Sequence, residues 1–288
     1  MARAFNPHYQ LPKRLRWLLG GASFALPILL WCAFSYLPFI WHPLVQITDT
    51  GGVSYFEVDM RTDRATFDEE TANMREQHLP LPHGFAANPV YLPAPHEVAK
   101  AFYTAFITPP PQAGDPWLHQ SLWHSVKLVF YAFLISSLIG VPLAILCGTS
   151  PIISRLTEPF VEFFRYLPAP AFGALMVAIL GIYDGPKIAI IVIGTLFQQI
   201  LIIANTTRKL DMGLMEAALT LGATRRRLLM NVVVPGILPD LYRDQRILLG
   251  WAWTYLIVAE LIGTSSGITW FITQQARYQH FDNVYAAI

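Results

Sequence analysis

Residues 216–235 read Glu-Ala-Ala-Leu-Thr-Leu-Gly-Ala-Thr-Arg-Arg-Arg-Leu-Leu-Met-Asn-Val-Val-Val-Pro, and this stretch decides how the rest of the chain is interpreted. It carries three consecutive arginines, Arg225, Arg226 and Arg227, and long apolar runs lie on either side of it in the sequence. Charged side chains are costly inside a lipid bilayer, so we expect this segment to lie outside the membrane while its neighbours cross it.

The residues in and around this stretch predict two short helices joined by a glycine turn. Asp211 is a favoured N-cap for the first helix, and Gly222 is a natural stop because glycine adopts the left-handed conformation without steric cost. Thr224 is expected to cap a second helix that runs through Asn231. Pro235 is expected to limit that helix because proline has no amide hydrogen to donate.

The first of these helices has an apolar face, made by residues spaced i, i+3, i+4 and i+7: Leu214, Ala217, Ala218 and Leu221. The two adjacent alanines are small enough to let the surface of another protein approach closely. This pattern favours a helix that lies in a groove of a partner protein. The alternative is an amphipathic helix that rests on the membrane surface.

The composition indicates an integral membrane protein. Of the 288 residues, 54% are hydrophobic and only 14% are charged, and the mean hydropathy is +0.41. A soluble domain has roughly 25% charged residues, so much of this surface must face lipid. The net charge of +1 argues against nucleic acid as a partner. The sequence has no Gly-x-x-x-x-Gly-Lys phosphate loop, so we do not expect this chain to hydrolyse ATP.

Neither the cysteines nor the histidines point to a chemical site. Cys32 and Cys147 lie far apart in apolar stretches, where core packing is the expected role of each. The histidines are scattered without the spacing of metal ligands, and we expect no metal site.

The N-terminal region predicts a first transmembrane helix. Residues 1–16 carry basic residues and no acid, which places the N-terminus in the cytoplasm by the positive-inside rule. Residues 17–41 form an apolar run that is long enough to cross a hydrocarbon core of about 30 Å.

Residues 42–118 form a polar excursion, which this orientation places on the extracytoplasmic side. Acidic residues outnumber basic ones there, the reverse of what a cytoplasmic loop shows. Within it, residues 53–58 alternate weakly as a short strand would, and residues 63–77 have a helical pattern. We expect a small module or a long ordered loop, and not an independent second domain.

Residues 119–288 are expected to form the core of the protein. Apolar runs at 126–147, 172–182, 187–204 and 247–262 follow the first span, so the sequence predicts five spans in an all-α helical bundle. The run at 172–182 has an amphipathic entry from Pro159, and residues 150–165 read as a loop. The loop at 205–246 is rich in bases and is therefore expected in the cytoplasm, with Arg208, Lys209, Arg225, Arg226, Arg227, Arg243 and Arg246.

The polar segment resembles the motif by which permeases of ABC importers couple to their ATPase. That motif consists of Glu-Ala-Ala, a glycine four positions on, and two aliphatic residues before a proline. It is matched here by Glu216, Ala217, Ala218, Gly222, Val232, Val234 and Pro235, with valines as conservative replacements at the two aliphatic positions. The resemblance implies that this loop, with Arg225 beside it, docks on a separate nucleotide-binding subunit that holds the ATP and magnesium.

Four further stretches resemble the nitrate, sulfonate and taurine branch of these binding-protein-dependent permeases. They are Leu-Pro-Ala-Pro at 92–95, Phe-Arg-Tyr-Leu-Pro at 164–168, Ala-Glu-Leu-Ile-Gly at 259–263 with Ser-Gly at 266–267, and residues 281–286. The excursion is longer than this branch usually has, so its role does not transfer. The branch also adds a final span where this chain stops, and we expect a sixth helix to be missing after Ile288.

Polar side chains inside the predicted spans are candidates for the translocation pathway, because such groups are costly in lipid. Gln198 and Gln199 have amides that could donate to a passing oxyanion, although hydrogen bonding between helices is an equal alternative. Glu260 is a third candidate, but a structural acceptor role is favoured because an anion pathway gains nothing from a carboxylate. Lys187 is expected to snorkel to the membrane interface.

The resemblance as a whole implies an inner-membrane permease subunit, not itself an enzyme, of an ATP-driven importer that works by alternating access. Its implied partners are nucleotide-binding subunits, a second permease copy in a homodimer, an extracytoplasmic solute-binding protein and lipid. The implied cargo is nitrate, a sulfonate or a taurine-like anion. Alternatives are a permease for bicarbonate, an aromatic acid or a pyrimidine-like solute, or a membrane scaffolding protein without transport.

Overall fold

The computed structural model describes residues 12–37, 41–109, 116–262 and 266–288 of the chain. The chain divides into two compact units. The described residues are mostly helical and include one small sheet. Unit 1 contains residues 1–109 and 274–288, and unit 2 contains residues 110–273. The expected core at 119–288 therefore differs from the observed division, because its last residues belong with the N-terminal unit.

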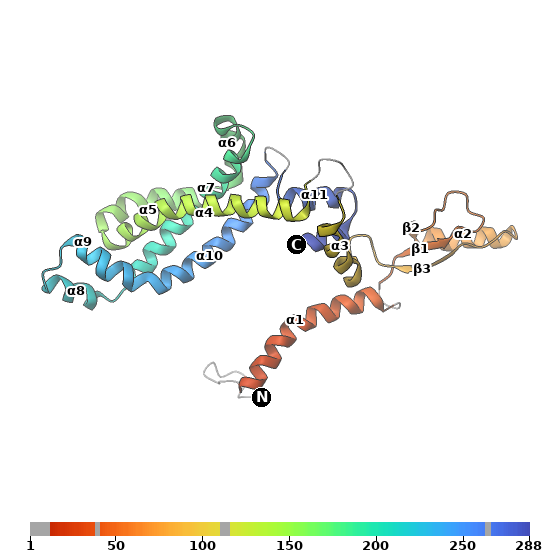
Figure 1. The fold of residues 1–288 in the computed structure, drawn as a ribbon, viewed down its shortest axis with the longest axis horizontal. Coiled ribbons are helices and arrows are strands. Elements are labelled where there is room, and N and C mark those ends of the chain that lie inside the picture. Colours follow the sequence, from red (N-terminus) through yellow and green to blue (C-terminus); the bar gives the residue numbers. More distant parts are fainter. Residues whose placement is uncertain (1–11, 38–40, 110–115, 263–265) are drawn as a thin grey trace. The chain divides into compact units, whose positions relative to one another are not determined.

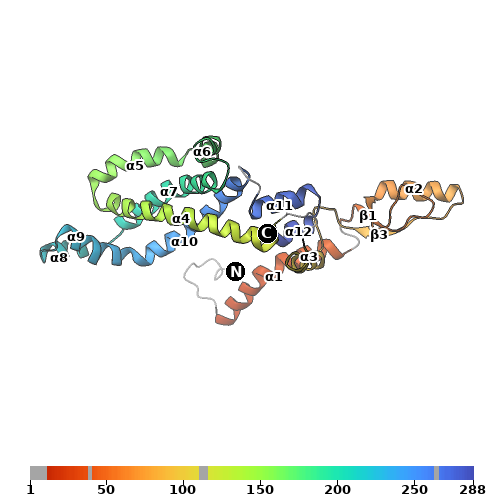
Figure 2. The ribbon, with the colours of Figure 1, turned by 45° about the horizontal axis from the view of Figure 1, so that its top comes forward.

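Unit 1 begins with a long apolar helix and continues into an α/β module (Figures 1 and 2). Its elements are α1 (Lys13–Tyr36), β1 (Leu44–Asp49), β2 (Arg61–Asp63), α2 (Arg64–Glu76), β3 (His83–Ala87), α3 (Pro95–Ile107) and α12 (Phe281–Ala287). The first predicted span is present as α1, although it begins and ends a few residues earlier than the apolar run at 17–41.

The expected excursion contains a three-stranded antiparallel sheet in the order β2-β1-β3, with Val45 opposite Thr62 and Ala86. The predicted helix at 63–77 is confirmed as α2. The predicted strand at 53–58 is wrong: these residues form turns, and Val53 and Phe56 pack against Ile47 of β1. Burial of the two side chains in a shared cluster replaces the pairing that a strand would need.

Unit 2 is built from helices alone in its described part. Its elements are α4 (Leu118–Thr149), α5 (Pro151–Arg165), η2 (Ala169–Phe172), α6 (Gly173–Leu180), α7 (Asp184–Arg208), α8 (Met212–Thr220), α9 (Arg225–Leu228), η3 (Leu229–Val233) and α10 (Val234–Glu260). α11 (Ile268–Arg277) crosses the boundary between the units. The stretch at 150–165, which was expected as a loop, is the helix α5.

Three described helices, α1, α4 and α7, are long and apolar enough to cross a membrane. A fourth span results if α5 and residues 169–180 are taken together, although an 87° bend separates them. The run expected at 172–182 is thus half of a broken element. The fifth expected span, at 247–262, is the second half of α10, whose first half carries Asp240, Arg243, Asp244 and Arg246.

Unit 2 is held together mainly by the packing of α4 and α10 against α7. The buried face of α4 is rich in small residues, including Ser125, Ala132, Ser136, Gly140 and Ala144. Small side chains let helix backbones approach closely, which is the main source of attraction between helices in lipid. The buried core lies between these helices and includes Ile190, Ile203 and Leu248.

Gly194 of α7 marks a place where two helices touch without room for a side chain. A Cβ atom there would lie 2.6 Å from the ring of Tyr255 on α10. Overpacking of this kind costs about 1–3 kcal/mol. We therefore expect Gly194→Ala to lower the thermal unfolding temperature of the detergent-solubilised protein.

The matched control is Gly250→Ala in α10, because no atom lies within 4 Å of the added Cβ. Alanine is the better helix former, so this variant should be as stable as the wild type or more so. Equal unfolding temperatures for Gly194→Ala and Gly250→Ala would contradict the observed packing.

Candidate functional site

The polar segment begins with the predicted capped helix. The Asp211 side chain accepts a hydrogen bond from the backbone amide of Gly213 at 2.9 Å and so caps α8. This satisfies one of the amides that every helix start leaves without a partner. The prediction of the cap and of the short helix is confirmed.

The turn after α8 is a Schellman motif. The amide of Ala223 donates to the carbonyl of Ala218 at 3.0 Å, and the amide of Gly222 donates to the carbonyl of Leu219 at 2.9 Å. Gly222 has φ +79°, the left-handed conformation that glycine adopts without cost. No atom lies within 4 Å of a Cβ built on Gly222, so the surface above the turn is open.

The second helix differs from the prediction. Thr224 caps α9 as expected, with its hydroxyl accepting from the amide of Arg227 at 3.4 Å. The helix is not limited by Pro235, however, because α9 continues through the π turn η3 into α10. A π turn changes the spacing of the backbone hydrogen bonds, and this one ends two residues before Pro235, which would interrupt a regular α-helix.

The tip of this segment, residues 211–227, exposes apolar side chains and cations together. Leu221 is 88% exposed and Leu214 is 53% exposed. Glu216, Ala217 and Gly222 are exposed, as are the side chains of Arg225, Arg226 and Arg227. Figures 1 and 2 show α8 and α9 at one end of unit 2. Such an exposed apolar helix beside a positive charge has the composition of a docking surface.

The remaining residues of the motif connect this tip to the bundle. Val232 and Val234 are half-buried, and Val233 between them is fully buried in the core of unit 2. Ala218 is also half-buried, while Pro235 is exposed. The structure thus joins the tip to the bundle through one continuous helix.

Gln199 lies in a hydrogen-bond network that joins three helices. Its Oε1 accepts from Ser136 of α4 at 2.7 Å, and its Nε2 donates to Ser137 of α4 at 2.9 Å and to Gln245 of α10 at 2.7 Å. Both N–H donors of its amide are therefore already used, and none remains for a passing oxyanion. Gln198 is half-buried and has no hydrogen-bond partner among the described residues. The two neighbours therefore have different environments.

Glu260 is almost completely buried and is bound by protein groups. Its Oε1 accepts from the Ser125 hydroxyl, and its Oε2 accepts from the amide of Thr269 at 2.8 Å. Gly267 has φ +99°, and a Cβ there would lie 2.1 Å from Glu260 Oε1. The close approach of the Gly267 backbone supports the structural alternative, in which this carboxylate holds the start of α11.

Lys187 does not snorkel to the membrane interface, so this prediction is wrong. The side chain is 0% exposed, and its Nζ donates to the Ser266 hydroxyl at 2.6 Å. Asp184 Oδ1 lies 3.8 Å from the same Nζ and 3.2 Å from His124 Nε2. Asp184 is only three residues away in the same helix, but Ser266 lies 79 residues away, and a single-sequence pattern does not reveal that contact.

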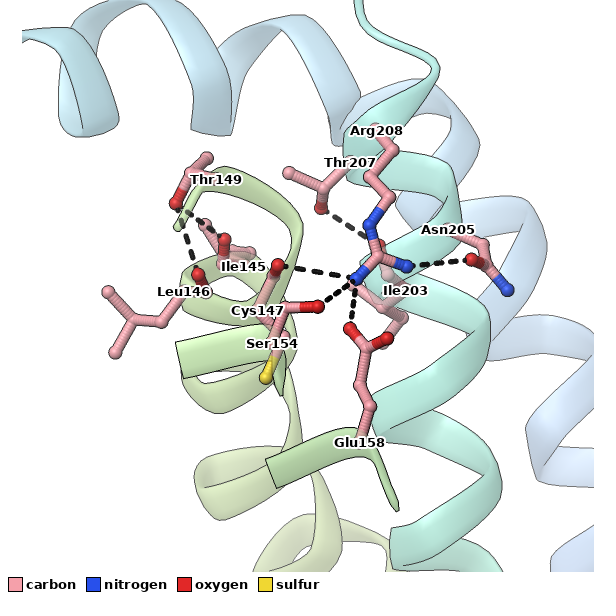
Figure 3. Close-up of polar contacts among 10 residues, drawn as sticks. All are labelled: Ile145, Leu146, Cys147, Thr149, Ser154, Glu158, Ile203, Asn205, Thr207 and Arg208. Carbon is pink, nitrogen blue, oxygen red and sulfur yellow. Dashed lines mark hydrogen bonds and ion pairs between the residues drawn. The ribbon is translucent and has the colours of Figure 1, made fainter. Parts of the chain in front are cut away.

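Arg208 joins three helices at the end of unit 2 that carries α8. Figure 3 shows its guanidinium pointing toward Ser154 and Glu158 of α5 and toward the carbonyl of Cys147 on α4. Sequence reasoning counted this arginine only as one of the loop bases. The spacing of Arg208 and Glu158 in the sequence gave no signal that they meet.

The described residues form a helical bundle with helices long and apolar enough to cross a membrane, and the comparisons show to which family it belongs. Residues 140–288 match the family described as "Binding-protein-dependent transport system inner membrane component". The taurine transport system permease protein TauC of Escherichia coli strain K12 is 30% identical over 201 residues, which cover 70% of this chain and 72% of that protein. The chain therefore belongs to this family and is a permease subunit of an ABC transporter.

Other similar proteins have related names. The putative aliphatic sulfonates transport permease protein SsuC of E. coli K12 is 31% identical over 197 residues, covering 68% of this chain and 72% of that protein. The bicarbonate transport system permease protein CmpB of Synechococcus elongatus is 24% identical over 165 residues, covering 57% and 59%. An inward-facing structure of the MetNI methionine ABC transporter has a TM-score of 0.52 at 21% identity and covers 59% of this chain and 84% of that chain. This structural similarity supports the helical fold described above.

The contrast between the two glutamines gives a testable prediction. We expect Gln199→Leu to lower the thermal unfolding temperature, because it leaves Ser136, Ser137 and Gln245 without their partner at a cost of about 1–3 kcal/mol. Gln198→Leu should leave the unfolding temperature unchanged and should reduce solute uptake if this amide faces the pathway. A stable Gln199→Leu protein would contradict the network, and full uptake by Gln198→Leu would remove it from the pathway.

Proposed function

We propose that this chain forms the pathway of an importer that moves a small sulfonate or a related anion into the cytoplasm. Support for the cargo comes from similar proteins whose names refer to taurine, aliphatic sulfonates and bicarbonate. Both carboxylate oxygens of Glu260 accept hydrogen bonds from protein groups, and the side chain is buried, so this residue would not be exposed to a passing anion. Gln198 is the remaining candidate for contact with the solute.

The observation that carries the mechanism is the exposed tip around Gly222. An ATPase subunit would receive α8 in a groove, with Leu214 and Leu221 buried on docking and with the open turn at Gly222 admitting a close approach. Arg225 and its neighbours would then lie beside acidic groups of the partner. ATP and magnesium would be bound by that partner and not by this chain.

The orientation of the chain in the membrane is inferred from the basic residues of the N-terminus and of the tip. A cytoplasmic N-terminus and a cytoplasmic tip place the sheet-containing part of residues 42–118 on the extracytoplasmic side. There a solute-binding protein would deliver the anion. A second permease copy would complete the pathway, since the few helices of one chain are not enough to enclose a pore. Closure of the two ATPase subunits would bring the two tips together and switch the bundle between its inward and outward states.

Uptake by proteoliposomes tests this function. The vesicles contain the permease with its ATPase subunits, ATP on the ATPase side, and the solute-binding protein with labelled taurine on the other side. We expect ATP-dependent accumulation of taurine, with competition from aliphatic sulfonates. Uptake without ATP would contradict the mechanism. Uptake of bicarbonate or nitrate but not of any sulfonate would replace the proposed cargo with that anion.

Substitution of Gly222 tests the docking site. We expect Gly222→Arg to insert into membranes normally but to lose binding of the ATPase subunit, because a long cation fills the open turn. The matched control is Gly222→Ala, which has nearly the same backbone strain, about 1 kcal/mol, and adds only a methyl group. It should retain binding. Normal solute-stimulated ATP hydrolysis with Gly222→Arg would argue strongly against docking at this turn.

A further inference from the structure

One guanidinium group contacts the ends of three helices of unit 2, close in sequence to the docking tip. Arg208 Nη2 donates to the Ser154 hydroxyl at 2.9 Å and to the Cys147 carbonyl at 3.4 Å, and it forms an ion pair with Glu158. Its Nη1 donates to Asn205 Oδ1 at 3.0 Å (Figure 3). We call Arg208, Glu158, Ser154 and the Cys147 carbonyl the arginine clamp. A guanidinium presents its donors in a rigid plane, whereas the ammonium group of a lysine is a rotatable point charge on a flexible stem.

The arginine clamp lies next to the docking helix in the chain. Arg208 is the last residue of α7, and Asp211 caps α8. Leu210 in the short link between them packs against the start of α10, where a Cβ built on Gly236 would lie 2.8 Å from Leu210 Cδ1. Because this link is short and closely packed, α8 and the end of α7 have little freedom to move independently. A displacement of α8 should therefore move Arg208 by a similar amount.

The partners of Arg208 determine which other helices would move with α8. The ends of α4 and α7 are already in close contact, since a Cβ on Gly148 would lie 2.4 Å from Thr207 Cβ. Between α7 and the N-terminal half of α5, Glu158 and Ser154 provide polar links through Arg208. After Arg165, α5 leads through an 87° bend into residues 169–180, with which it could form a broken membrane span. Movement of α5 thus extends to the apolar part of the bundle.

The exposure of the clamp favours positioning over stability as its role. The side chains of Arg208 and Glu158 are 36% and 21% exposed, so water screens their attraction. Ion pairs at exposed sites typically contribute only about 0–1 kcal/mol to stability. The value of the clamp is therefore the geometry that it imposes on the helix ends. Loss of the clamp should leave the bundle folded.

We propose that Arg208 is a positioning residue that transmits displacement of α8 to α5 during transport. The proposal rests on the proposed function, in which a partner ATPase moves α8. It assigns to the arginine clamp the conversion of ATP-driven motion into rearrangement of the membrane helices. Without the clamp, α8 still docks and still follows the ATPase, but α5 no longer moves with it.

The test measures the number of solute molecules transported per ATP hydrolysed in proteoliposomes that contain the complete transporter. We expect Arg208→Gln to bind the ATPase normally and to hydrolyse ATP, while the ratio falls about tenfold, within the usual range of coupling between sites. Glu158→Gln, which breaks the ion pair from α5, should lower the ratio in the same direction. Arg208→Lys retains the charge but not the fork of donors, so its ratio should lie between those of Arg208→Gln and the wild type.

The matched control is Arg243→Gln, which removes the same charge from an exposed ion pair with Asp240 within α10. Its ratio should equal that of the wild type. An unchanged ratio in both Arg208→Gln and Glu158→Gln would overturn the proposal, as would loss of ATPase binding or failure of both variants to fold. Failure of the proposed function would look different, because the wild-type protein itself would then show no ATP-dependent uptake.

Discussion

The structure of unit 2 depends on the cost of leaving a polar group without a partner in hydrocarbon. Lipid offers no hydrogen bonds, so backbone groups must be satisfied within helices and polar side chains must find one another between helices. The Gln199 network and the Glu260 contacts meet this requirement by joining separate helices, and the Lys187 contact joins α7 to the segment before α11. Gln199 and Glu260, which look unfavourable in the sequence, thus act as links between helices in the fold.

The same constraint explains why the docking tip is located where it is. Three adjacent arginines have no room for enough acidic partners inside a bundle of this size, so residues 225–227 lie outside it. α8 lies outside the bundle as well, because the turn at Gly222 connects it directly to the helix that carries these arginines. Apolar side chains such as Leu221 then become exposed to water. A partner protein that covered them would relieve this exposure, and this would be the driving force of the proposed docking.

Features that depend on neighbouring residues could be predicted from the sequence. The Asp211 cap, the Gly222 turn, the Thr224 cap and the helix α2 all follow from local rules and are confirmed. Features that depend on distant partners could not. Lys187 is buried with its Nζ bound to Ser266, and Arg208 forms an ion pair with Glu158; neither contact is recognisable from spacing alone. The helix at 151–165 was missed because its prolines and charges resemble those of a loop.

The most direct test of the account is contact between the tip and an ATPase subunit. Leu221→Cys would be made in a variant whose native cysteines, Cys32 and Cys147, are replaced by serine, and the membranes would be treated with a short thiol-to-amine cross-linker. We expect a cross-linked product of permease and ATPase subunit, which should be absent with Ile152→Cys on α5, where the side chain is 80% exposed compared with 88% for Leu221. Cross-linking at residue 152 but not at residue 221 would contradict the account.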